Sequence, residues 1–400
     1  MTFLCISFYF KGAAFLEACA AEGNTVFLLT KKSLENHPWP RASLSNIFYM
    51  EDDANSPQNL DSLRKGVAWL MKENKIDRIV ALDDFDVEKA SFLREEFRIP
   101  GMGQTTSRYF RDKLAMRMRA KENGIPVPPF SPLFNDADIN QFADHVAPPW
   151  VVKPRSEASA TGIKKVHNKE ELWEAVHALG DLREKHLVEQ FLPGDVYHVD
   201  AISYDGELAF CQVSKYLNTP FEVAHGGGIF RSQTVPYKGV EEEALRKLTG
   251  EVMLAFGMQF SASHTEFIRS HADGHFYFLE TSSRVGGAHL AEMVEYASGV
   301  NLWAEWARLE TAMAKGEEYA LPVIRQDHAG ILISLARYEK PDTSHFNDPE
   351  IVWRIDKPHH VGFIVQASTR ERVTELLDQY AERVYHEFHA SAPAPDKPHD

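Results

Sequence analysis

Two glutamates in the stretch HTEFIRSHADGHFYFLETSSR have the spacing of metal ligands on a hairpin. Two alternating runs flank Ala272-Asp273-Gly274, and the glycine suits the left-handed position of a three-residue loop. A hairpin centred on Asp273 places Glu266 directly opposite Glu280. Like charges so placed destabilise a sheet, and paired carboxylates are typical ligands of Mg²⁺, so the pair indicates a bound cation. A solvated hairpin face in a different register is the alternative.

A cation and a flexible backbone follow this hairpin. Arg284 lies two residues past Ser282 and beside Gly286-Gly287. An arginine next to a bound metal can neutralise charge that develops on a phosphoryl group. Taken alone, Arg284 also fits an ordinary surface arginine.

Lysines and a loop of small residues form a second candidate element. Lys153 ends an apolar strand just before Pro154, where an unpaired ammonium would be costly, and a phosphate ligand would explain it. The loop 156–162 that follows contains Ser159 and other small residues, so its backbone N–H groups can approach phosphate oxygens. An ordinary polar hairpin loop is the alternative. Lys113 lies beside the apolar stripe of a helix, a position typical of a snorkelling surface lysine.

An extended segment, Glu189-Gln190-Phe191-Leu192, precedes Pro193-Gly194. It can offer backbone groups and an apolar side chain to a purine edge. His198 and Asp200 follow on one strand face and could contact a ribose. An edge strand with polar residues is the alternative.

A glycine-rich stretch, 224–228, contains His225 and is followed by Arg231. Such a segment could be a mobile lid that closes on the reacting groups. A flexible surface loop is the alternative.

The first hundred residues alternate between short apolar runs and helix-length amphipathic stretches, which predicts a parallel sheet with crossover helices. The expected strands are Phe3–Phe8, Val26–Thr30 and Ile79–Leu82, and the expected helices are Gly12–Glu22, Gln58–Asn74 and Val87–Phe97. The third strand ends in Asp83–Asp86, at the sheet edge where open α/β folds tend to bind ligands.

The rest of the chain is expected to mix helices and strands. A capped helix begins at Ser107, with Phe110, Leu114 and Met118 on one stripe, and ends at Asn123-Gly124. Two strands lie within 150–166, and Asp205-Gly206 is a hairpin turn. The further strands are Leu187–Leu192, Val196–Tyr204, Ala329–Ala336 and His360–Gln366, and the further helices are Lys169–Leu179 and Arg370–Glu387.

Composition narrows the class of protein. The 400 residues carry 58 acidic against 43 basic side chains, a formal charge of −15, which disfavours nucleic acid and anionic membranes as partners. Three scattered cysteines do not form a disulfide scaffold, so a reducing, cytoplasmic location is expected. The apolar start MTFLCISFYF lacks the features of a signal peptide and fits a buried strand, and no run is long enough for a membrane helix.

Taken in order, these elements resemble the ATP-grasp enzymes. The residues that carry the resemblance are Lys113, Lys153, Glu189 with Leu192, Glu266 with Glu280, and Arg284. It implies an α/β and α+β multidomain fold: a Rossmann-like pre-ATP-grasp domain over 1–105, then a linker helix and small subdomain over 106–205. A large subdomain with the metal site over 206–320, a carboxyl-terminal α+β section over 321–390 and a flexible tail over 391–400 would follow.

Within that superfamily the segments Ala81–Asp86, His264–Glu266 and His360–Gln366 most resemble the branch of L-amino-acid ligases and biotin-carboxylase-like enzymes. In that branch His198 is expected against the nucleotide. The common metal motif is Glu-x-Asn-x-Arg, whereas this chain has Ser282 in place of the asparagine. Ser282 could still give an oxygen to a metal.

The resemblance implies an ATP-dependent carboxylate–amine ligase that forms an amide through an acyl phosphate, with Mg²⁺, or alternatively Mn²⁺, on the two glutamates and Ser282. Its substrates would be a small carboxylate and an amine, and a homodimer is compatible with it. The residues implied to bind ATP are Lys113, Lys153, Ser159, Glu189, Phe191, Leu192 and His198. Those implied in catalysis are Arg284, Arg231 and His225.

Two other functions fit the same sequence. A carboxylase-type enzyme would activate bicarbonate and would need an acceptor from another chain. A nucleotide-binding homologue without catalysis is the third hypothesis, and Ser282 is the feature that favours it.

Overall fold

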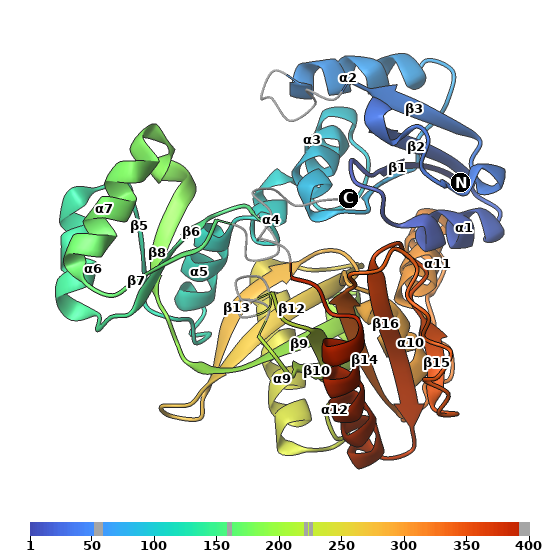
Figure 1. Cartoon of the computed structure of the whole chain (residues 1–400). Coiled ribbons are helices and arrows are strands. Elements are labelled where there is room, and N and C mark those ends of the chain that lie inside the picture. The colour runs from blue at the N-terminus through green and yellow to red at the C-terminus, as the bar shows by residue number, and fades with distance from the viewer. Residues whose placement is uncertain (52–58, 158–161, 220–222, 224–226, 392–400) are drawn as a thin grey trace.

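The computed structural model describes residues 1–51, 59–157, 162–219, 223 and 227–391, and its strands form three sheets (Figure 1). The first sheet has the order β3-β2-β1-β4, and all its strands are parallel. Its elements are β1 (Thr2–Ile6), α1 (Ala13–Ala21), β2 (Thr25–Lys31), β3 (Asn46–Met50), α2 (Asn59–Leu70), β4 (Arg78–Ala81) and α3 (Val87–Phe97). The predicted parallel sheet with crossover helices is therefore present.

The second sheet is small and antiparallel, with the order β5-β8-β6-β7. It follows two short helices, α4 (Gln104–Arg108) and α5 (Lys113–Glu122). Its own elements are β5 (Phe130–Pro132), α6 (Asp136–His145), β6 (Trp150–Pro154), β7 (Lys164–Val166), α7 (Lys169–Leu179) and β8 (His186–Gln190). The predicted strand, loop and strand over 150–166 are β6, its following loop and β7.

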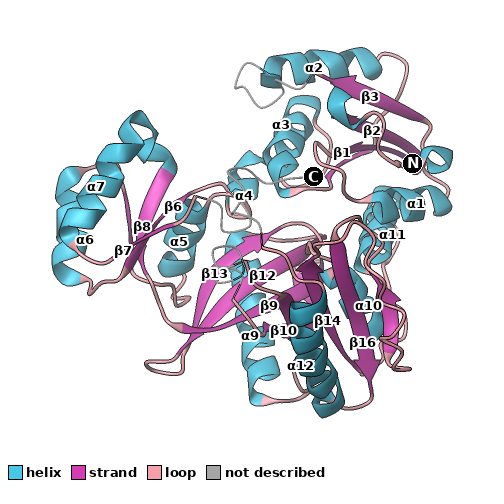
Figure 2. Ribbon diagram, in the orientation of Figure 1, coloured by secondary structure: helices cyan, strands magenta, loops and turns pink. Residues whose placement is uncertain are grey.

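The third sheet is the largest, with the order β13-β12-β9-β10-β11-β14-β16-β15. Its strands are β9 (Gly194–Tyr204), β10 (Glu207–Tyr216), β11 (Phe230–Thr234), β12 (Ser261–Ser270), β13 (Phe276–Ser282), β14 (His328–Leu335), β15 (Ile351–Arg354) and β16 (His360–Ala367). The helices that pack on it are α9 (Val240–Phe256), α10 (Leu290–Ser298), α11 (Leu302–Lys315) and α12 (Arg370–Glu387). Figure 2 shows these helices flanking the magenta strands.

The sheets divide the chain differently from the expected domain boundaries. The boundary at 205 assigns β9 to the small subdomain, but β9 lies in the large sheet between β12 and β10. The section expected after 320 is also continuous with that sheet, because β14 pairs with β11. The fold therefore places the strand carrying His198 in the same sheet as the glutamate hairpin. Nearly all of the expected tail lies outside the described residues.

The helix that carries Lys113 begins later than predicted. Ser107 belongs to α4, and α5 begins at Lys113 with Asp112 as its N-cap. The predicted apolar stripe is wrong at Met118, which is half exposed, because the buried face of α5 turns instead toward Arg117 and Ala120. The predicted end of the helix is confirmed, since Gly124 adopts φ +72° just after it.

Hydrophobic cores hold the sheets and helices together. In one of them Phe15 of α1 contacts Trp306 of α11. This contact packs a helix of the first sheet against a helix of the large sheet. Another core packs Phe256 of α9 against Phe278 of β13, behind the glutamate hairpin. Among the described residues, no helix is long and apolar enough to cross a membrane.

Candidate active site

A cavity of about 880 Å³ lies among the three sheets. Most residues predicted from the sequence line it: Lys113, Lys153, Glu189, Phe191, Leu192, Glu266, Glu280, Ser282 and Arg284. They come from α5, β6, β8 and its following turn, β12, β13 and the segment after it. The cavity therefore brings together side chains from all of these elements.

The glutamate hairpin has the predicted register at the two glutamates, although the pairs nearer its loop are shifted by one residue. Glu266 on β12 pairs directly with Glu280 on β13, and Gly274 in the connecting loop adopts the left-handed φ of +72°. A shift in register follows immediately, between Glu266 and Phe267. Both carboxylates face the cavity, so the solvated-face alternative is wrong.

Lys113 supplies a positive charge beside one of these carboxylates. Its Nζ lies 2.7 Å from Glu280 Oε2 and donates a hydrogen bond of 2.7 Å to the carbonyl oxygen of Glu157. Burial alone would raise the pKa of Glu280, but Lys113 outweighs it and the pKa is lowered. The side chain of Lys113 is only 12% exposed, so it is a buried cavity residue and not a snorkelling surface lysine.

The other carboxylate is held from two sides. The Tyr216 hydroxyl donates a 2.9 Å hydrogen bond to Glu266 Oε1, and His264 Nε2 lies 3.6 Å from the same oxygen. Tyr216 comes from β10 and His264 from β12 itself. Together these contacts fix the direction in which the Glu266 carboxylate points.

Lys153 is buried as expected, but it has a protein partner. Its Nζ contacts Glu189 Oε1, and Arg117 Nε donates a 3.0 Å hydrogen bond to Glu189 Oε2. Burial lowers the pKa of Lys153 to about 8, although Glu189 opposes that shift. The two cations outweigh burial at Glu189 and lower the pKa of its carboxyl. A Glu189 ion pair therefore already neutralises Lys153 in this structure, so its burial is explained without the phosphate ligand that the sequence suggested.

His198 does not reach the cavity, which corrects the expectation that it contacts the nucleotide. Its side chain is completely buried, and its ring packs on Tyr216 with centroids 4.6 Å apart. Tyr216 lines the cavity, so His198 lies behind it. His198 Nε2 lies 2.7 Å from Ser232 Oγ, and its Nδ1 lies 2.8 Å from Asp200 Oδ2.

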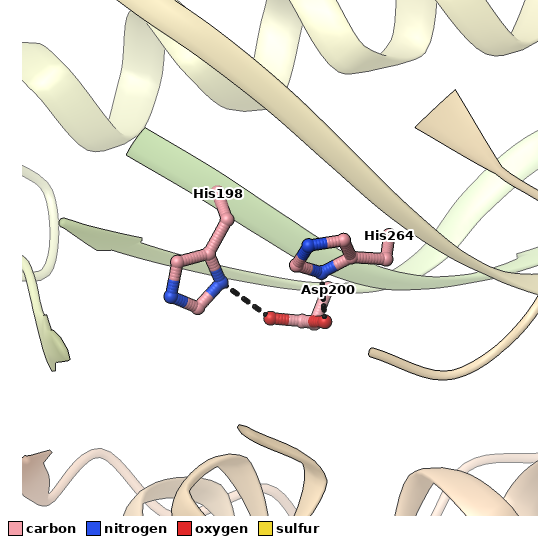
Figure 3. A group of neighbouring side chains, drawn as sticks. All are labelled: His198, Asp200 and His264. Carbon is pink, nitrogen blue, oxygen red and sulfur yellow. Dashed lines mark hydrogen bonds and ion pairs between the residues drawn. The ribbon is translucent and has the colours of Figure 1, made fainter. Parts of the chain in front are cut away.

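Asp200 connects His198 with His264 (Figure 3). The second carboxylate oxygen of Asp200 accepts a 2.9 Å hydrogen bond from His264 Nδ1. Burial alone would lower the pKa of His264, but Asp200 and then Glu266 raise it to about 10. The cluster could be mistaken for a metal site, because the three ligand atoms lie within 4.8 Å of one another. Protonated His264 already supplies the cation that Asp200 requires.

Gly286 lies against this buried pair. A Cβ added there would lie 2.7 Å from Asp200 Oδ1 and 2.9 Å from His264 Nδ1. A Cβ on the neighbouring Gly287 would meet no atom within 4 Å. The absence of a side chain at Gly286 therefore lets the chain after Arg284 approach β9 and β12.

Arg284 is held by the first sheet. Its Nε donates a 2.9 Å hydrogen bond to Asp84 Oδ2, and NH2 contacts the same oxygen. Asp84 belongs to the turn after β4. The sequence predicted that this turn lies at the ligand-binding edge of the first sheet. Burial alone would raise the pKa of Asp84, but Arg284 outweighs it and lowers that pKa. The pair places the predicted catalytic arginine at the cavity wall and neutralises it there.

Arg231 is not brought to the cavity. Side chains alternate along β11, so Phe230 faces the cavity while Arg231 points the other way. Arg231 NH1 lies 2.8 Å from Asp378 of α12, and its Nε donates to Asn218. The prediction that Arg231 acts on the reacting groups is therefore not met in this structure. His225 and Ser159 lie outside the described residues.

One part of the cavity wall, next to β8, carries apolar side chains. Phe191 and Leu192 line it together with Val151 and Ile163. Lys165 Nζ lies 3.7 Å from the centre of the Phe191 ring. An apolar slot with a nearby cation suits a flat aromatic base, as the sequence predicted for the Glu189–Leu192 segment.

Sequence reasoning missed Arg117 and Tyr216. Arg117 could have been found, because it follows Lys113 by four residues and so shares its face of α5. Nothing local distinguishes Tyr216 in the sequence, since its contact with Glu266 depends on pairing across strands.

Comparisons with known proteins support the resemblance. Residues 120–218 match the family model described as D-ala D-ala ligase C-terminus. An L-arginine-specific L-amino acid ligase of Bacillus subtilis is 29% identical over 264 residues, which is 64% of this chain. The alignment spans 62% of that relative, about three fifths of its length.

Solved structures share the fold. An L-amino acid ligase from Bacillus licheniformis superposes with a TM-score of 0.77 at 18% identity, covering 97% of this chain and 98% of that one. The biotin carboxylase domain of the Hydrogenobacter thermophilus 2-oxoglutarate carboxylase, solved with MgADP and bicarbonate, gives 0.68 at 16% identity, covering 94% and 88%. The resemblance to ATP-grasp ligases is thereby confirmed, and the chain has their mixed α/β multidomain fold.

Proposed function

We propose that this protein is an ATP-dependent carboxylate–amine ligase that forms an amide and releases ADP and phosphate. The observation that carries the proposal is the pairing of Glu266 with Glu280 at the wall of one cavity, with Lys113, Lys153 and Arg284 around them. Of the relatives named above, the L-arginine-specific L-amino acid ligase supports this reaction class, and the 2-oxoglutarate carboxylase domain, solved with MgADP, supports nucleotide binding by the same fold.

The carboxylates suit a hard divalent cation. Glu266 and Glu280 each present oxygens to the cavity, and Ser282 adds a hydroxyl on the same strand as Glu280. These residues would hold Mg²⁺, with Mn²⁺ as a substitute, and the ion would neutralise charge on the ATP phosphates. Tyr216 and His264 then orient Glu266, while Lys113 orients Glu280.

The remaining groups position ATP and the reacting atoms. Lys113 and Lys153 would bind phosphate oxygens, and the apolar slot around Phe191 and Leu192 would bind adenine. The substrate carboxylate attacks the γ-phosphorus, the bond from that phosphorus to the ADP oxygen breaks, and an acyl phosphate forms. The amine nitrogen then attacks the acyl carbon and phosphate leaves. Arg284 would stabilise negative charge in both steps.

The test is ADP release from MgATP with L-amino acids supplied singly and in pairs, with mass spectrometry of the products. We expect ADP and a condensed amide in equal amounts. Glu280→Gln should lose this activity, while Glu207→Gln, an exposed glutamate on β10 of the same sheet, should keep it. Bicarbonate-dependent ADP release without any amine would contradict the proposal, and so would unchanged activity of Glu280→Gln.

A further inference from the structure

Arg111 is a buried arginine whose guanidinium has no hydrogen-bonded or ion-paired partner among the described residues. Its side chain lines the cavity, and the residue is only 8% exposed. The guanidinium stacks on Phe85, with 4.4 Å from Cζ to the ring centre. Across the described part of the chain, no hydrogen bond or ion pair to the guanidinium is found.

Other arginines at this site are paired. Arg117 is held by Glu189 and by the carbonyl oxygen of Leu279, and Arg284 is held by Asp84. A guanidinium that is removed from water without a partner destabilises the fold. Arg111 lies at the cavity wall despite that cost. An anionic ligand in the cavity would supply the missing partner for its charge.

The charges around Arg111 define what this ligand must carry. Phe85 and Asp84 belong to the same turn after β4, and Asp84 is close enough for Arg111 to lower the pKa of its carboxyl. Arg284 already neutralises that carboxylate. Two arginines therefore share one carboxylate, which leaves one uncompensated positive charge on this side of the cavity. A single carboxylate would balance it, and arginine matches the geometry of a carboxylate.

We propose that Arg111 binds a carboxylate group of the small-molecule substrate, next to the turn that carries Asp84 and Phe85. The assignment rests on the proposed ligase function and deepens it, because it names a binding residue for an acid substrate in the same cavity. The carboxylate that Arg111 binds is either the group that becomes activated or the α-carboxylate of the amine substrate. Arg111 lies in the segment that joins α4 to α5, just before Lys113. A substrate bound there would contact both this segment and the turn after β4 of the first sheet.

The experiment measures binding independently of turnover. The parent, Arg111→Gln, Arg111→Lys and the control Arg108→Gln are titrated calorimetrically with the protein L-amino acids and with their C-terminal amides, in the presence of Mg²⁺ and a non-hydrolysable ATP analogue. Arg108 is an exposed arginine on the preceding helix. We expect the amino acid that binds the parent best to bind Arg111→Gln about tenfold or more weakly, as loss of a charge-assisted hydrogen bond predicts.

Arg111→Lys should retain part of the affinity, and Arg108→Gln all of it. The amide, which lacks the carboxylate, should bind the parent and Arg111→Gln equally. If Arg111→Gln fails to fold, Arg111→Lys carries the comparison, because it keeps the charge but loses the planar fork. In active protein, a rise in KM for one substrate alone identifies which carboxylate Arg111 binds.

Three outcomes would overturn the assignment: parental amino-acid affinity in Arg111→Gln, a loss of affinity for the ATP analogue instead, or no amino acid binding to the parent at millimolar concentration. Failure of the ligase proposal is distinguishable. Amino-acid binding that depends on Arg111, without ADP release in the parent, would reject the ligase function and leave this binding site standing.

Discussion

Asp84 and Arg284 are 200 residues apart in the chain, and they form an ion pair between the first sheet and the end of β13. Both side chains are buried, at 8% and 13% exposure. Because the pair lies at the cavity wall, it links the docking of the first sheet to the position of the arginine that the proposed reaction needs.

Breaking this pair should destabilise the protein. Asp84→Asn leaves a buried guanidinium without its counter-charge, so we expect the free energy of unfolding to fall by about 3 to 5 kcal/mol. Urea unfolding measures the change. The control is Asp61→Asn, which removes an exposed carboxylate paired with Arg64 and should have no measurable effect. Equal effects of the two substitutions would show that the Asp84 contact is not important for stability.

The two glycines after Arg284 should respond differently to alanine. Gly286→Ala forces a methyl group against Asp200 and His264, which are buried and cannot easily move, so we expect a loss of about 1 to 3 kcal/mol in unfolding free energy. Gly287→Ala meets open space and should be nearly neutral. Thermal and urea unfolding of both variants tests this, and a reversed order would contradict the packing described here.

Binding of MgATP should weaken at alkaline pH because of Lys153. Its pKa of about 8 means that the ammonium is charged at pH 7 and largely neutral at pH 9, where it no longer attracts phosphate. Calorimetric titration with an ATP analogue should show the dissociation constant rising over this range, by at most about tenfold per pH unit. Lys153→Arg stays charged, so its slope should be smaller. An equal slope in both proteins would assign the effect to another group.

The His264–Asp200 pair should stabilise the protein most at low and neutral pH. Because the pKa of His264 is raised to about 10 in the fold, its contribution is complete below its ordinary value of 6.5 and is lost as the pH rises through 10. His264→Gln should therefore cost about 3 to 5 kcal/mol of unfolding free energy at pH 6 and clearly less at pH 10. His275→Gln, an exposed histidine, is the control. A cost that does not change with pH would contradict a charged His264.

Local patterns in the sequence predicted much of the fold. The helices Val87–Phe97, Lys169–Leu179 and Arg370–Glu387 have the predicted bounds. Asp205 and Gly206 both adopt positive φ, as the predicted hairpin turn requires. The strand β3 was missed, because Asn46–Met50 is a half-buried edge strand without a clear alternation of polar and apolar residues.

The candidate site was predictable from local spacing where one hairpin fixes it. The Glu266–Glu280 pair follows from a hairpin centred on Asp273. Lys113 was assigned to the site only by the family resemblance, because its helix position alone indicated a surface lysine. His198 and Arg231 could not be placed, because burial behind Tyr216 and pairing with Asp378 both depend on elements distant in sequence. The unpaired charge of Arg111 is likewise visible only in three dimensions. The homodimer and the cytoplasmic location stay predictions.

The order of strands in the large sheet has a consequence for how the chain folds. The hairpins β9–β10 and β12–β13 join neighbours in sequence, but β11 finds its second partner, β14, only about a hundred residues later. Until residues 328–335 have been synthesised, β11 is a sheet edge with unpaired backbone groups, of the kind that promotes aggregation. Chains that end before β14 should therefore accumulate as insoluble protein even though every residue of the glutamate hairpin is present.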